Sequence, residues 1–166
     1  SLDTNGFTVT CGSFQGLGTT TRSITLGAST INCTGIGLFA TGLTFTANTS
    51  TFNCSGASSS LTTVDTGGVT FNDVNLTGGG RGIMDDGGTF ANLTRDGGAV
   101  TTNELCLLAS ITVTGTLTLT GNSNINRLYV GTYQSSRVQN TITAATVSAQ
   151  YCDFQDILGE GDASWN

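Results

Sequence analysis

The sequence predicts an all-β protein, a right-handed parallel β-helix (β-solenoid) of about eight rungs. The first observation behind this prediction is a recurring strand ending, Val-Thr-Cys, Ile-Asn-Cys and Phe-Asn-Cys, which closes on Cys11, Cys33 and Cys54 at nearly equal intervals. The interval is typical of solenoids, whose repeats of about 20 residues bury their apolar faces only by stacking on their neighbours.

The second observation is an aromatic repeat that continues beyond the cysteines. Phe52, Phe71 and Phe90 follow one another at a constant interval, slightly shorter than that of the cysteines, and the first two are each followed by an asparagine. A coil whose length varies in this way favours a right-handed parallel β-helix over the strict short repeats of hexapeptide solenoids.

The third observation is strict alternation of apolar and hydroxyl side chains, as in residues 111–114 and 117–120. Such alternation is typical of half-buried strands. An antiparallel sandwich also has many short alternating strands, but it does not predict equivalent cysteines and Phe-Asn pairs at a nearly constant offset. A leucine-rich repeat would need a recurring leucine framework that the chain lacks.

The elements follow in three sections with no linker between them, so the whole chain, residues 1–166, is predicted to be one domain. Residues 1–60 form three rungs that close on the three cysteines. Residues 61–105 are rich in glycine, and we expect loops at 78–82 and 85–88. Residues 106–166 return to regular alternation and end with a strand at 149–154.

Three columns of side chains are expected along the axis, with stacked residues about 4.8 Å apart, the spacing of neighbouring strands. We expect a ladder of small buried thiols, because free cysteine packs as a small hydrophobe. The asparagines are predicted either to bond to one another along the axis or to serve as ordinary turn residues. The structural ladder residues are Cys11, Cys33, Cys54, Asn32, Asn53, Asn72, Phe52, Phe71 and Phe90.

Charge and composition exclude several functions. The net charge is −6, with five scattered arginines, no lysine and no histidine. A basic stripe for nucleic acid is therefore absent, as are a Ser-His-Asp triad, a Schiff-base lysine and a histidine-bound metal. No run of 18 apolar residues is present, so no membrane partner is expected. We also expect no cofactor and no metal. The five arginines are Arg22, Arg81, Arg95, Arg127 and Arg137.

One charged constellation carries an alternative hypothesis. Arg81, Asp85, Asp86, Arg95 and Asp96 lie on the glycine-rich loops of adjacent repeats, where stacking is expected to bring them together. Paired carboxylates would suit glycoside hydrolysis, and several oxygens would suit calcium. The competing interpretation is solvated turn residues, because Asp-Gly pairs form turns by themselves.

Residues 2–10, 23–31, 147–156 and 163–166 resemble the repeat sections of bacteriophage tail and virion β-helix proteins. The resemblance implies a right-handed β-helix on a particle or cell surface, and it supplies no catalytic residues. It favours a non-enzymatic structural or adhesive rod, such as a tail fibre or decoration segment, located on a virion or outside the cell.

Two other functions stay open: a polysaccharide-degrading enzyme using Asp85, Asp86 and Asp96, and a bacterial surface adhesin or extracellular filament subunit. Because uncapped solenoid ends expose strand edges, we expect the chain to be a segment of, or a subunit in, a larger assembly. The predicted partners are further copies of the chain, as a trimer or an end-to-end filament, and a cell-surface glycan.

Overall fold

The computed structural model describes residues 1–56, 62–98, 103–132 and 138–165, and these contain β-strands and no helix. Arg137 lies outside the described residues. The strands form three sheets, here called A, B and C, and every strand pair within them is parallel. The predicted fold class, a parallel β-solenoid, is therefore confirmed.

Sheet B is the longest sheet and extends along the whole molecule. Its strands are β2 (Thr8–Thr10), β5 (Thr30–Cys33), β8 (Thr51–Cys54), β10 (Thr70–Leu76), β12 (Gly88–Asp96), β14 (Ile111–Thr120), β16 (Asn140–Gln150) and β18 (Ile157–Glu160).

Sheet C forms the opposite wall, and sheet A closes a third side near the N-terminus. Sheet C contains β3 (Ser13–Gly16), β6 (Gly35–Leu38), β9 (Thr62–Asp65), β11 (Arg81–Asp85), β13 (Asn103–Leu107), β15 (Leu128–Thr132) and β17 (Cys152–Gln155). Sheet A contains β1 (Leu2–Asp3), β4 (Arg22–Thr25) and β7 (Leu43–Thr46).

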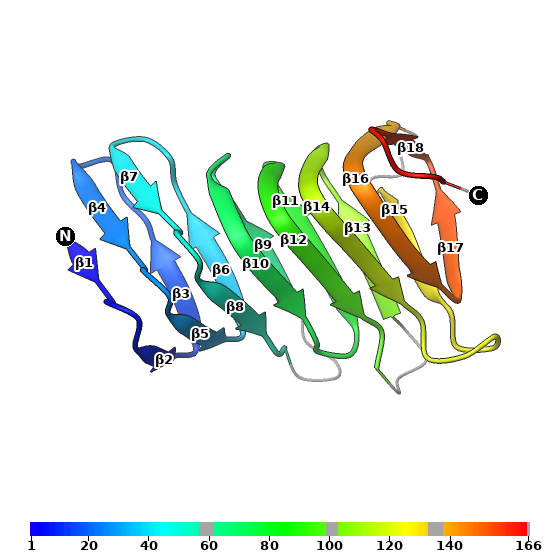
Figure 1. Ribbon diagram of the computed structural model, residues 1–166, viewed down its shortest axis with the longest axis horizontal. Coiled ribbons are helices and arrows are strands. Elements are labelled where there is room, and N and C mark those ends of the chain that lie inside the picture. Colours follow the sequence, from blue (N-terminus) through cyan, green and yellow to red (C-terminus); the bar gives the residue numbers. More distant parts are fainter. Residues whose placement is uncertain (57–61, 99–102, 133–137, 166) are drawn as a thin grey trace.

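The coil is right-handed. In Figure 1 the long strands of sheet B, β10, β12, β14 and β16, run downward on the near side while the chain advances from left to right, and sheet C returns upward behind them. This is the hand that twisted parallel strands favour for their crossover connections. The two termini consequently lie at opposite ends of the long axis.

Alternation along each strand builds the core. In β5 and β8 the first and third residues are half-buried, whereas the second and fourth are buried. Because side chains alternate between the two faces of a strand, one face of each sheet fills the coil with leucine, isoleucine, valine and phenylalanine. The other face carries threonine, asparagine and serine to solvent.

The turns that lead into sheet B repeat one backbone conformation. Asn5, Gly27, Asn48 and Gly67 each begin such a turn with a positive φ of 45° to 64°. Asparagine and glycine are the residues that adopt this left-handed conformation most readily. The turns also bond along the axis, since the Thr49 amide donates to the Gly27 carbonyl at 3.1 Å.

Sheet A ends after β7 because the coil loses a side. In the third coil, β9 leads directly into the turn that begins at Gly67, which leaves no residues for a further strand of sheet A. The residues of each later coil lie in longer strands of sheet B instead, which lengthen from four residues in β8 to eleven in β16. The expectation of about eight rungs is slightly too high: the stack has about six turns, and the eight strands of sheet B include its short end strands, β2 and β18.

Candidate functional site

The cysteine column forms inside the N-terminal half of the coil. Cys33 and Cys54 are register partners on β5 and β8, and their Sγ atoms lie 3.6 Å apart. Both are buried, whereas Cys11 is half-buried at the end of the column, with its amide bonded to the Asn32 carbonyl at 3.0 Å. All five cysteines are free thiols. The hydrogen bond between the two thiols, together with burial, raises the pKa of Cys54, and the same bond lowers the pKa of Cys33. Both side chains are buried in the core and pack there as small hydrophobic groups.

The asparagine column forms on the outer face of sheet B, but with one member different from the prediction. The Asn53 amide donates to the Asn32 side-chain oxygen at 3.0 Å, and Asn75 donates to Asn53 at 3.0 Å. Asn72 is not the next rung; its amide donates to the Ser50 carbonyl at 3.2 Å. The register explains the difference, because Asn53 is paired with Asn75 across β8 and β10.

The phenylalanine column is buried and extends further than the repeat indicated. Phe71 and Phe90 are register partners whose rings stack at 5.7 Å, and Phe52 meets Phe71 edge-on at 5.4 Å. Phe14 from sheet C and Phe45 from sheet A also join the cluster. These two residues lie outside the regular Phe interval, so the repeat alone did not reveal them.

Arg95 has a structural position that the sequence hypothesis missed. Its side chain is only 2% exposed and occupies an inward position of β12, two residues after buried Leu93. The guanidinium donates to five carbonyl oxygens and, among the described residues, contacts no carboxylate at hydrogen-bond distance. The five acceptors belong to Leu76, Gly78, Gly80, Asp96 and Glu104. Burial lowers the Arg95 pKa, and the carbonyls stabilise the charge. Arg95 therefore fixes the glycine-rich connection between β10 and β11.

The remaining members of the charged constellation do not gather. Asp85 ends β11 and Asp86 follows in the turn before β12, whereas Asp96 is the last residue of β12. A nine-residue strand separates the two ends by about 30 Å. Arg81 pairs instead with Glu104 on the neighbouring strand β13. The expected acid, base or calcium cluster of Asp85, Asp86 and Asp96 is therefore not formed.

Asp65 is the residue that Asp85 does approach, since the two are register partners on β9 and β11. Burial, together with the charges of Asp86 and Asp85, raises the Asp65 pKa. Its Oδ1 atom accepts a hydrogen bond from the Gly67 amide at 3.1 Å, as in an ordinary aspartate turn. Within the described ranges, no three His, Cys, Asp or Glu side chains are placed to hold a metal ion.

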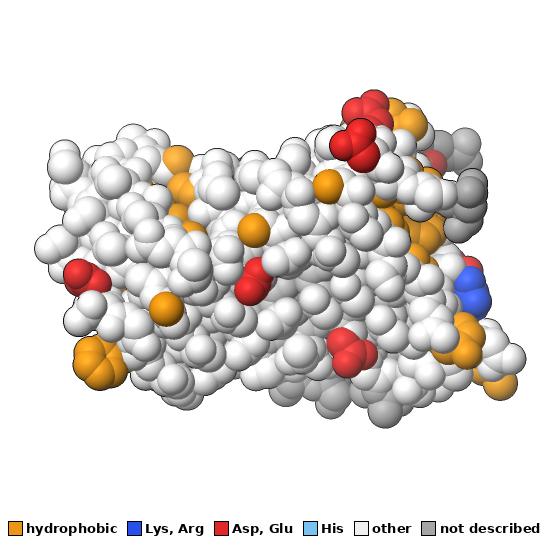
Figure 2. Space-filling view, in the orientation of Figure 1, with side chains coloured by type: hydrophobic (Ala, Val, Ile, Leu, Met, Phe, Trp, Pro, Cys, Tyr) orange, Lys and Arg blue, Asp and Glu red, His pale blue; other side chains and the backbone are white. Residues whose placement is uncertain are grey.

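The outer face of sheet B is a flat polar surface. Figure 2 shows this face toward the viewer, with mostly uncharged atoms and only scattered acidic and apolar side chains. Its rows are in register; one of them contains Thr70, Thr89, Thr112 and Thr143. The described part of the chain contains no helix that could span a bilayer.

The two ends of the coil are the most distinctive surfaces of the molecule. At the N-terminal end, Leu2 is the register partner of buried Ile24 yet is 46% exposed. At the C-terminal end, Phe154 is the partner of buried Val130 yet is 44% exposed. Both residues occupy core positions of their sheets, so each interior column emerges at an end of the coil. The outermost strands of sheets B and C also leave one backbone edge unpaired at each end.

The C-terminal end is partly covered by the residues that follow β18. The Trp165 ring meets Phe154 edge-on at 6.4 Å and covers Gly159, and its indole nitrogen donates to the Glu160 carbonyl at 3.3 Å. A hollow of about 300 Å³ remains between Trp165 and the apolar residues of β16, β17 and β18. The cover is therefore incomplete.

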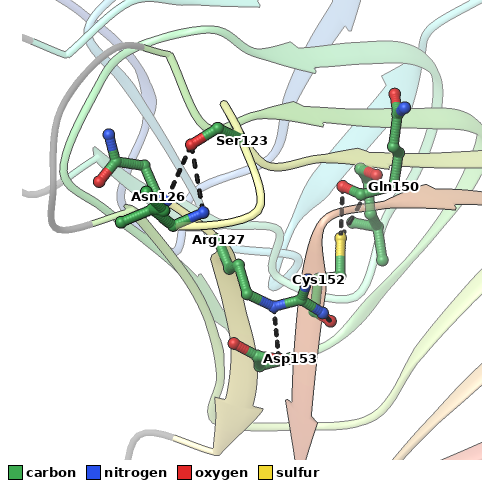
Figure 3. A network of polar contacts seen from close by, with 8 residues as sticks. Ser123, Asn126, Arg127, Gln150, Cys152 and Asp153 are labelled. Atoms are coloured by element: carbon green, nitrogen blue, oxygen red, sulfur yellow. Dashed lines mark hydrogen bonds and ion pairs between the residues drawn. The ribbon is translucent and has the colours of Figure 1, made fainter.

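A polar network fixes the last turn before this end (Figure 3). Arg127 donates to the Asp153 carboxylate at 2.7 Å, and the Cys152 thiol donates to the Gln150 carbonyl at 3.3 Å. The Ser123 hydroxyl accepts a hydrogen bond from the backbone N–H of Asn126 at 3.0 Å. The Arg127–Asp153 ion pair joins the start of β15 to β17, whereas the other two hydrogen bonds fix the local turns on either side of it.

Comparison of the chain with protein-family models, with curated proteins and with solved structures finds no match.

Proposed function

We propose that this chain is a non-enzymatic structural and adhesive rod that associates with further copies of itself. The observation that supports the proposal best is the continuous register of sheet B from β2 to β18, with buried columns of cysteine and phenylalanine beneath it. Such a stack is stiff, because each coil contacts the next along its full width.

The exposed core positions at the coil ends support end-to-end association. A second copy that placed its β2 and β3 beside β18 and β17 would continue both sheets, because every strand is parallel. It would cover Phe154 and Leu2 in the same step and would satisfy the free strand edges. A head-to-tail contact of this kind does not close on itself, so it generates a filament.

The resemblance of the chain to bacteriophage tail and virion β-helix proteins supports a location on a virion. In that setting the rod would serve as a tail fibre or decoration segment. A bacterial surface filament would use the same geometry.

Sedimentation velocity and electron microscopy between 1 and about 50 μM test the self-association. We expect species larger than the 16.9 kDa chain, appearing as lengthening rods. Phe154→Asp should reduce them at least tenfold, because it places a charge at the centre of the contact. Ile125→Asp is the matched control, because Ile125 is 86% exposed in a loop. A monomer throughout this range, or equal assembly of Phe154→Asp, would overturn end-to-end stacking; side-by-side trimers would replace it with lateral association.

A further inference from the structure

A hollow on the outer face of sheet C has a floor of glycine. In β6, Ile36 and Leu38 point into the core, so Gly35 and Gly37 occupy the two outward positions. The flanking strands carry Ser13 and Gln15 on β3 and Asp65 on β9, in register with these glycines. Because the outward face of β6 carries no side chains, the surface there is open over a volume of about 400 Å³. This volume lies within the range of small-molecule sites.

The fold does not require glycine at position 37. Its φ is not in the left-handed region, and an added Cβ would meet only ordinary contacts, 3.8 Å from Leu17 and 3.9 Å from Gln15. Gly16 on β3 differs, because a Cβ there would lie 2.9 Å from the Leu38 side chain. Glycine inside a strand weakens the sheet, and where packing does not demand it, it often marks the close approach of a ligand.

Two other strand glycines of this chain are covered by flat rings. A Cβ at Gly131 would lie 2.4 to 2.7 Å from the Tyr129 ring, and one at Gly159 would lie 2.3 to 2.6 Å from the Trp165 ring. Rings that cover a glycine in this way restore the missing contact surface of the strand. No aromatic side chain of the described residues covers Gly37.

The groups around the hollow indicate what kind of ring would fit. Phe39 and Leu17 line one end and are 49% and 51% exposed. The Gln15 amide makes no hydrogen bond with any residue that the structure describes, and the hydroxyls of Ser13 and Thr34 lie on the same lining. An apolar platform beside amide, hydroxyl and carboxylate groups complements a sugar, which has an apolar C–H face and a rim of hydroxyls.

The charge of the lining residues indicates whether a neutral or an anionic sugar would bind. Among the residues that the structure describes, the ionisable member of the lining is Asp65, and no arginine lines the hollow. Arg22 is close in sequence to Leu17 of the lining, but its guanidinium donates hydrogen bonds to the backbone carbonyls of Gly16, Thr20, Phe39 and Thr41. A carboxylate without a cation accepts hydrogen bonds from hydroxyls and repels anionic sugars.

From these observations we propose that the hollow above Gly35 and Gly37, bounded by Gln15, Phe39 and Asp65, binds an uncharged hexose residue of a glycan. The sugar ring lies over the glycines, as the Tyr129 ring lies over Gly131. This inference names a ligand for the adhesive part of the proposed rod. It is independent of the coil ends, so either proposal can fail without the other.

Saturation-transfer NMR and titration with the intact chain test the site. The probes are neutral oligosaccharides of glucose, galactose, mannose and N-acetylglucosamine, with sialylated oligosaccharides as the charged comparison. We expect at least one neutral probe to bind with a Kd of about 1 mM, the strength that a single ring supports. Gly37→Val should weaken this binding at least tenfold, because the valine side chain fills the floor.

Ser148→Val is the control, because it introduces the same valine side chain at an exposed position of β16, and its affinity should equal that of the unmodified chain. Phe39→Ala and Gln15→Ala, which leave the floor untouched, should each weaken binding as well and keep the test valid if Gly37→Val fails to fold. Absence of binding to every neutral probe, preference for sialylated probes, or unchanged affinity in folded Gly37→Val would overturn the proposal.

Discussion

At the scale of single residues, burial separates structural groups from surface groups more clearly than residue type does. Arg95 looked like a member of a charged site, yet it lies inside the coil and bonds to backbone carbonyls. Part of this position could be predicted from the sequence, because the alternation Leu93-Thr94-Arg95 places Arg95 on the same face of the strand as Leu93. The bulge between Phe90 and Leu93, which brings Phe90 to that face as well, is visible only in the structure. Arginine at an inward strand position indicates a backbone-bonding role when no acidic partner shares that face.

Arg95→Met should destabilise the protein by at least about 3 kcal/mol, because hydrogen bonds from a charged donor are lost and buried carbonyls are left unpaired. Urea unfolding followed by circular dichroism measures this free energy. Arg81→Met is the control; its partner Glu104 is half-buried and its own side chain 43% exposed, so its loss should stay below about 1 kcal/mol. Equal midpoints for the two variants would contradict a structural role for Arg95.

Thiol reactivity provides a second test at this scale. Burial raises the pKa of Cys106 to about 11, and the hydrogen bond with Cys33 together with burial raises that of Cys54. Burial also raises the pKa of Cys11, but Cys11 is more accessible than Cys54. At pH 8 the folded chain should therefore react with iodoacetamide at half-buried Cys11 before Cys54. Mass spectrometry after urea unfolding should find all five cysteines labelled. Labelling of Cys54 in the folded chain as fast as Cys11 would contradict the buried column.

At the scale of elements, the sequence predicted the ladders well and their register less well. The cysteine interval equals the true register between β5 and β8, so Cys33 and Cys54 became neighbours as expected. The Phe-Asn interval equals the true register between β10 and β12, where Phe71 meets Phe90. Between β8 and β10, however, the coil is longer, and Asn75 takes the rung expected for Asn72. Coil length changes with each turn, and no single period describes it.

The prediction that loop carboxylates gather failed for a related reason. Asp86 and Asp96 are close in sequence, but a complete strand of sheet B separates them. Residues half a coil apart in a solenoid lie on different sides of the coil, whereas residues one coil apart are neighbours. Asp65 and Asp85, one coil apart, are therefore the pair that the fold joins.

The phenylalanine column should carry a large share of the stability. Phe71 is 1% exposed and contacts Phe45, Phe52 and Phe90. Phe71→Ala should cost about 3 to 5 kcal/mol, because it opens a cavity in the middle of the stack, and Phe71→Leu should cost less. The unfolding free energy in urea measures both. Ile125→Ala should change it by no more than about 0.5 kcal/mol; a similar small change in Phe71→Ala would show that the column contributes little.

At the scale of the whole molecule, stability should depend on position along the axis. The middle strands β10, β12 and β14 are long and paired on both sides, whereas β1, β2 and β18 are short and lie at edges. In a solenoid each coil is stabilised by its nearest neighbours, so hydrogen exchange should be slowest in the middle strands and fastest at the ends. Mass spectrometry of peptic fragments measures this gradient. Uniform protection would indicate a single all-or-none unit instead.

The parallel hydrogen-bond ladders also have a mechanical consequence. Their bonds point along the long axis, so tension applied between the two ends loads the bonds of one interface at a time rather than shearing a whole sheet. The coil should therefore yield by peeling one turn after another, each releasing about 70 Å of slack for a turn of about 20 residues. Such a tether extends in steps under load and dissipates a pull that would break a rigid link at once.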